Sequence, residues 1–179
     1  MAHNKSAEAQ FAEFLAKYDA EIAELAEAIR EEMRKLYPTA LEVVYDNYNA
    51  LVIGFGPSER ATEAIFSIAL YPKWVSLFFL QAKGLPDPDK ILKGSGSVAK
   101  HIVLASPDVL HYPAVRVLMQ EAELGAKVAF DPHGEHRLII KSVSAKQRPR
   151  RPAGKETVAA ARTGKKSDLK KASGGARAL

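Results

Sequence analysis

The chain has 179 residues, a formal net charge of +5 and no cysteine. The absence of cysteine excludes disulfides, a thiol nucleophile and Cys-ligated zinc or iron–sulfur sites. The charge is divided unevenly, because residues 1–145 hold 15 Lys and Arg against 19 Asp and Glu, whereas residues 146–179 hold 11 against 2. These numbers predict one mildly acidic domain over residues 1–145 and a basic tail over residues 146–179.

The N-terminal sequence, MAHNKSAEAQF, lacks the charged and then apolar pattern of a signal peptide. No apolar run approaches the length that spans a membrane. We therefore expect a soluble cytoplasmic protein that makes no membrane contact.

Helices are predicted from capping residues and apolar periodicity. Ser6 begins the first helix, and Asp19 begins the second, which ends at Pro38. A third helix is predicted over residues 113–124, followed by a glycine. A shorter helix is expected over residues 86–93.

Strands are predicted from short runs rich in Val, Ile, Phe and Tyr that Gly, Pro, Asn and Asp interrupt. These runs cover residues 41–45, 50–55, 63–71, 74–81 and 98–104, with a further edge strand at residues 138–140. The pattern indicates an α+β fold with an antiparallel sheet of about five strands, covered by two N-terminal helices and one C-terminal helix.

The third and fourth predicted strands are apolar on both faces. Ile68 and Leu70 alternate with Ala69 and Tyr71, and a sheet with two apolar faces must be covered on both. Where the helices do not cover it, we expect a ligand pocket or a homodimer contact. The aromatic residues of this candidate pocket are Tyr45, Tyr48, Tyr71 and Trp74. The alternative role of such residues is packing at the edge of the core.

The tail over residues 146–179 has almost no large apolar residues, so it is predicted to be disordered. Its cations would attract phosphate backbones without reading sequence, although no aromatic residue lies among them to stack on bases. The candidate residues for nonspecific nucleic-acid contact are Arg148, Arg150, Arg151, Lys165, Lys166, Lys170 and Lys171. The alternative is a tail that only increases solubility.

Several motifs in order resemble one family over about residues 7–126. After the paired helices and Tyr45, they are Ile68–Pro72, Val75–Phe79, Leu92–Gly96 and Lys100–Leu104. The chain resembles the YdhG-like family (domain of unknown function 1801). This resemblance implies a small α+β domain with an antiparallel sheet. One branch of the family, in bacilli, is described as a frataxin-like iron chaperone, so iron is the metal that the resemblance would imply.

Two groups of residues are candidate metal ligands. Glu24, Glu27 and Glu31 share a face of the second predicted helix, where carboxylates bind hard cations weakly. The loop after the third helix gathers two imidazoles and two carboxylates that suit zinc or ferrous iron. Its candidate ligands are Asp131, His133, Glu135 and His136. The alternative for both groups is an ordinary solvated surface.

A glycine-rich turn flanked by cations is a candidate anion site, because glycine lets backbone amides approach an anion. Its residues are Lys93, Gly94, Ser95, Gly96, Lys100 and His101. A strand and not a helix follows this turn, so a flexible strand entry is the alternative.

No nucleophile or general acid–base pair emerges from the spacing of Ser, His, Asp and Glu. We therefore favour a binding module for a small ligand or metal ion. The second hypothesis is a nucleic-acid-associated accessory protein that acts through the tail. An enzyme is the least favoured hypothesis.

Overall fold

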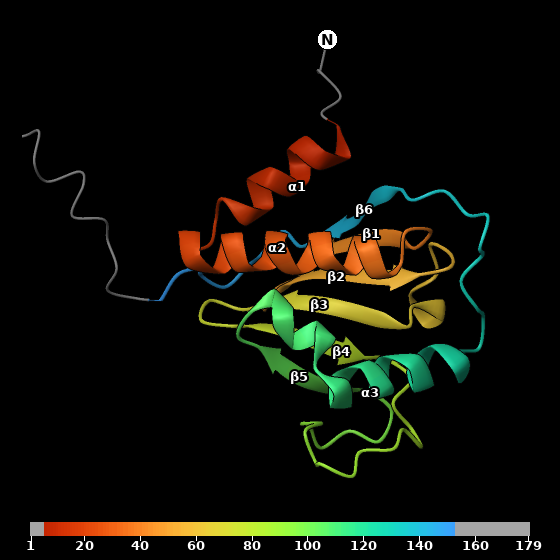
Figure 1. Ribbon diagram of the computed structural model, residues 1–179. Coiled ribbons are helices and arrows are strands. Elements are labelled where there is room, and N and C mark those ends of the chain that lie inside the picture. Colours follow the sequence, from red (N-terminus) through yellow and green to blue (C-terminus); the bar gives the residue numbers. More distant parts are fainter. Residues whose placement is uncertain (1–5, 153–179) are drawn as a thin grey trace, which may run out of the picture.

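The computed structural model of the chain describes residues 6–152 (Figure 1). Its elements are α1 (Ala7–Leu15), α2 (Ala20–Leu36), β1 (Leu41–Asp46), β2 (Leu51–Gly56), η1 (Ala61–Glu63), β3 (Phe66–Leu70), β4 (Val75–Phe79), β5 (Lys100–Leu104), η2 (Pro107–His111), α3 (Pro113–Leu124) and β6 (Leu138–Val143). The two η elements are short 3-10 helices. The α+β class is therefore confirmed.

The strands form one sheet in the order β5-β4-β3-β2-β1-β6. Neighbouring strands from β1 to β5 pair antiparallel, as predicted. The sixth strand, β6, pairs parallel to β1, with a shift of register between Val44 and Tyr45. The predicted edge strand at residues 138–140 is thus confirmed, and it makes the sheet mixed.

Local signals place the helix ends where they were expected. The Ser6 hydroxyl accepts a hydrogen bond from Ala9 N at 3.2 Å and caps α1. The helix predicted over residues 86–93 is wrong, because that segment forms turns. The Asp87 carboxylate accepts hydrogen bonds from the backbone N–H groups of Ile91 and Leu92, and these bonds fold the segment into a loop.

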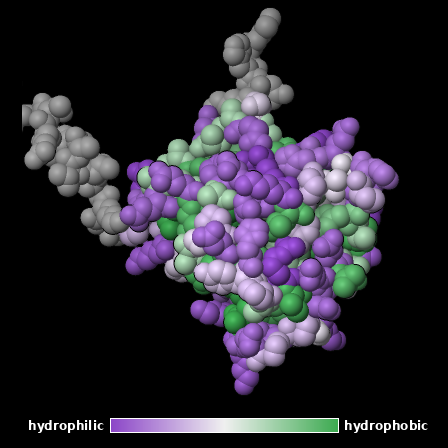
Figure 2. All heavy atoms as spheres, in the orientation of Figure 1, coloured by the Kyte–Doolittle hydropathy of each residue, from purple (hydrophilic) through white to green (hydrophobic). Residues whose placement is uncertain are grey.

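One face of the sheet carries the hydrophobic core, and we call it the first face. Alternate strand residues point to opposite faces, so the pairing register assigns each residue to one of them. One row across the first face consists of Val44, Ile53, Ile68, Leu77 and Ile102, all buried. Buried residues of α1, α2 and α3 join the same core cluster. In Figure 1 these helices lie on the near side of the sheet, and Figure 2 shows hydrophilic side chains over the region of α1 and α2.

The opposite face, which we call the second face, is covered differently. The segment that follows η1 packs on β2, where a Cβ added to Gly56 would lie 2.9 Å from Ala64 Cα. Helices therefore lie on both sides of the sheet, with α-helices on the first face and a short 3-10 helix at one end of the second. None of the helices within residues 6–152 has the length and apolar character of a membrane span.

Candidate functional site

The predicted metal ridge on α2 does not form a site. Glu24, Glu27 and Glu31 lie along the helix, and Glu27 Oε1 is 3.8 Å from Arg30 Nη1. Within the part of the chain that the structure describes, no group of three or more His, Asp or Glu is placed to hold a metal ion.

The predicted metal loop is also corrected by the structure. Asp131 Oδ1 accepts a hydrogen bond from the His133 backbone N at 2.9 Å, which closes a local turn. His136 pairs with a residue outside the loop, because its Nε2 lies 2.9 Å from Glu42 Oε1. The four predicted ligands are therefore not brought together.

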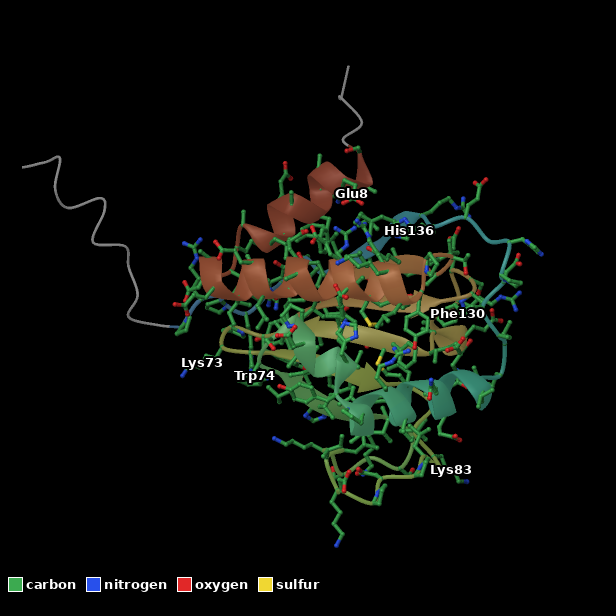
Figure 3. All side chains as sticks on the ribbon, viewed as in Figure 1. Glu8, Lys73, Trp74, Lys83, Phe130 and His136 are labelled. Carbon is green, nitrogen blue, oxygen red and sulfur yellow. The ribbon has the colours of Figure 1, made fainter. Side chains whose placement is uncertain are left out.

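His136 belongs instead to a charged cluster that also contains Glu8, Arg30, Arg34 and Glu42. Glu42 is fully buried on the first face of β1, 2.6 Å from Arg30 Nε and 2.5 Å from Arg34 Nε. Both arginines also reach Glu8, at 2.9 and 2.8 Å. Figure 3 shows Glu8 and His136 above α2, beside β6.

The charged cluster fastens α1, α2 and the loop before β6 to the sheet. Partial burial acts to raise the pKa of Glu8, but hydrogen bonds from Arg30 and Arg34 hold it below its usual value. Buried charges of this kind require paired and hydrogen-bonded partners, which the cluster supplies. We interpret the cluster as structural, since its carboxylates are occupied by arginines.

The residues of the predicted anion site bond to one another. Lys93 and His101 form an isolated bridge through two backbone hydrogen bonds, of 2.7 and 3.0 Å. Gly94 has a φ of +111°, and its carbonyl accepts a hydrogen bond from Lys100 Nζ at 2.5 Å. The turn therefore presents a carbonyl to the lysine, whereas an anion site needs converging N–H groups. Ser95 and Gly96 are exposed beside it.

The predicted boundary of the disordered tail at residue 146 is wrong, because residues 144–152 pack on the domain. We call this segment the C-terminal strap. Arg150 is 4% exposed, and its Nη2 lies 2.8 Å from Asp46 Oδ1 and also donates to Asn47 O. Arg151 donates to the carbonyls of Ala16 and Tyr18.

These bonds remove two arginines from the candidate residues for nucleic-acid contact. Arg150 is buried and Arg151 is tied to the end of α1, so neither is a free cation. Arg148 is exposed, with its guanidinium 5.6 Å from the centre of the Tyr48 ring. The candidates Lys165, Lys166, Lys170 and Lys171 lie outside the described residues.

The predicted aromatic residues divide into two groups. The rings of Tyr71 and Trp74 stack, with their centres 5.0 Å apart, and Trp74 is 43% exposed. Both residues lie one position beyond the paired strand ends, so the alternation places them on the second face. Tyr45 lies on the same face in β1, whereas Tyr48 lies in the turn after β1.

The second face has two rows that the register defines. The first row is Tyr45, Val52, Ala69, Ser76 and Val103, and the second row is Val43, Gly54, Ser67, Phe78 and His101. The Phe78 and His101 rings stack across β4 and β5, with their centres 4.8 Å apart. Burial, and then the nearby Lys93, lower the pKa of His101.

Small side chains therefore separate two stacked aromatic pairs. Ala69 and Ser76 lie between the Tyr71–Trp74 pair and the Phe78–His101 pair. Among the described residues, the buried Ser76 hydroxyl has no hydrogen-bond partner. Trp74 and Val103, at 43% and 41% exposed, are the more open side chains of this face. This arrangement suits a flat ligand that stacks on aromatic rings.

Phe78, His101 and Val103 were not predicted as pocket residues. The signal that could have found them is the two-residue alternation of β4 and β5, which puts Phe78 on the side of Trp74. The sequence did not show which face the helices would leave open.

Comparisons of the chain with protein-family models, with curated proteins and with solved structures gave no match.

Proposed function

We propose that this protein is a non-enzymatic binding module, related to the YdhG-like family, that holds a planar organic ligand on the second face of its sheet. One observation carries the proposal, which is the pair of aromatic stacks on either side of the Ala69 and Ser76 floor. Stacked rings offer a flat apolar surface, and ligand sites combine such surfaces with few polar groups. The polar group that reaches the surface of this face is the His101 ring.

The binding role is favoured over catalysis by how three of the four histidines within residues 6–152 are used. His101 stacks on Phe78, His111 pairs with Glu32 at 3.0 Å, and His136 pairs with Glu42. None of these three is paired with a nucleophile. The metal alternative is less favoured, since the predicted ligand sets are not assembled in residues 6–152.

The test is a titration of isotope-labelled full-length protein with adenosine, uridine and riboflavin, followed by amide chemical shifts. We expect the largest shifts at Ala69, Ser76 and Val103, and their loss in Trp74→Leu. Tyr112→Leu is the matched control, because Tyr112 is 53% exposed between η2 and α3. Shifts confined to α1, α2 and α3, or no shifts at all, would contradict the proposal.

A further inference from the structure

We infer that the ligand of the second face is single-stranded nucleic acid, with bases stacked on Trp74 and on the Phe78–His101 pair. This inference rests on the proposed function and names the class of ligand. Stacking on aromatic side chains is a main source of affinity for single strands, whose bases have open faces. The exposed ring of Trp74 provides such a surface without displacing any residue of the first-face core.

Cations are placed at both ends of the aromatic surface. Lys93 lies directly opposite His101 in the isolated bridge, so its side chain belongs to the same side of the sheet. Lys73 precedes Trp74 in the turn between β3 and β4, and Figure 3 shows both at one end of the sheet. The acidic side chains of α2, in contrast, belong to the helical side. Two lysines therefore flank the aromatic surface, and the acidic side chains of α2 lie on the other side of the sheet.

The C-terminal strap is the last segment that the structure describes. Arg150 and Arg151 fix the strap beside the turn after β1 and the end of α1, as far as Pro152. In Figure 1 this point lies at the same end of the sheet as the turn between β3 and β4. Residues 153–179 then hold seven Lys and Arg against two Asp and Glu. A basic sequence of this composition attracts phosphates without reading bases.

A second copy of the chain fits this face less well. Stable interfaces bury about 1,200–2,000 Å². Ala69 and Ser76 are already 3% and 0% exposed, so the central part of the face has little area left to bury.

The experiment uses the full chain and fluorescein-labelled oligouridylate and oligothymidylate of about twelve nucleotides, a length within the range of single-strand sites. Anisotropy measures affinity, and the fluorescence of Trp74 reports stacking because the chain has one tryptophan. We expect quenching of Trp74 and a loss of affinity of about tenfold in Trp74→Leu. The two probes distinguish RNA from DNA as the source of the ligand.

Matched variants distinguish the contribution of the second face to nucleic-acid affinity from that of the basic tail. Lys93→Ala should weaken binding, whereas Lys127→Ala, an exposed lysine after α3, should not. Changing Lys165, Lys166, Lys170 and Lys171 to Gln should reduce the salt dependence and retain the quenching of Trp74.

Three results would overturn the inference. The first is equal affinity of Trp74→Leu and the native chain, because the tail alone would then hold the strand. The second is equal binding of a duplex, whose bases are not free to stack. The third is a dimer in light scattering that Trp74→Leu converts to a monomer. If the nucleosides and riboflavin still shift the second face in any of these cases, the proposed function stands and only the nucleic-acid inference fails.

Discussion

Arg150 and Asp46 form a buried ion pair across 104 residues of sequence, with Arg150 Nη2 2.8 Å from Asp46 Oδ1. Asp46 also accepts a hydrogen bond from Lys17 Nζ at 2.7 Å. Ser144 N donates to Asp46 O, and Arg148 N donates to Tyr48 O, so the C-terminal strap is held along the turn after β1. The folded domain therefore includes the strap, and a domain cut at residue 145 would lack one of its buried charges.

Removal of Arg150 is expected to destabilise the fold. Arg150→Met should lower the free energy of unfolding by about 3 kcal/mol, because Asp46 stays buried and keeps only the partly exposed Lys17. Urea unfolding followed by Trp74 fluorescence measures this change. A chain ended after residue 145 should show the same loss, and a chain ended after residue 152 should not. Equal stability of the two shortened chains would contradict the role of the strap.

The charged cluster predicts a second large effect. Glu42→Gln should lower the free energy of unfolding by about 3–5 kcal/mol, since Arg30 would remain buried without its closest carboxylate. Glu59→Gln is the matched control, because Glu59 pairs with Lys141 at the surface and such pairs contribute about 0–1 kcal/mol. Chemical denaturation of both variants tests the difference. Similar losses of unfolding free energy in the two variants would contradict a large contribution of the charged cluster to stability.

Two buried tyrosines predict loss of stability at alkaline pH. Burial raises the pKa of Tyr18 and of Tyr37 to about 12, from 10.0. Above pH 10 the unfolded chain releases these protons while the folded chain retains them, so their contribution to stability is lost between 10 and about 12. Tyr18→Phe should reduce the fall of the unfolding free energy with rising pH. The part of this fall that is due to Tyr37 should remain.

The same variant also tests a pair of hydrogen bonds. The Tyr18 hydroxyl donates to Leu70 O at 3.1 Å and accepts from Leu51 N at 3.0 Å. Its loss should cost roughly 1–3 kcal/mol at neutral pH, because both backbone groups are left buried. Urea midpoints measured from neutral to alkaline pH separate the two effects, with Tyr112→Phe as the exposed control. An unchanged alkaline slope in Tyr18→Phe would assign the titration to other groups.

Removal of the Ser76 hydroxyl is expected to leave stability unchanged or to increase it, unlike the substitutions above. Ser76→Ala should leave the free energy of unfolding unchanged or raise it by up to about 1 kcal/mol, because a buried hydroxyl without a partner is removed. Ser58→Ala is the comparison, since the Ser58 hydroxyl bonds to Glu63 and to Arg60 N and its removal should lower the unfolding midpoint. A clear loss of stability in Ser76→Ala would show that the hydroxyl has a partner in solution.

The α+β class, the three α-helices and the antiparallel character of the first five strands were predictable from the sequence alone. Its signals are local ones, such as the Ser6 cap, the proline after α2 and the turns between short apolar runs. It also showed that β3 and β4 are apolar on both faces. The candidate pocket residues Tyr71 and Trp74 were predicted on this basis, and the structure places them together on the second face.

The pairing of distant charges and the sheet face that the α-helices leave open depend on tertiary contacts. Glu42 and Asp46 look like ordinary strand residues, but the register turns both toward the first face, where distant arginines pair with them. His136, which was predicted as a metal ligand in the loop, instead pairs with the buried Glu42. The physical reason is desolvation, because a buried carboxylate must find cations wherever the fold brings them, and sequence spacing carries no record of that distance.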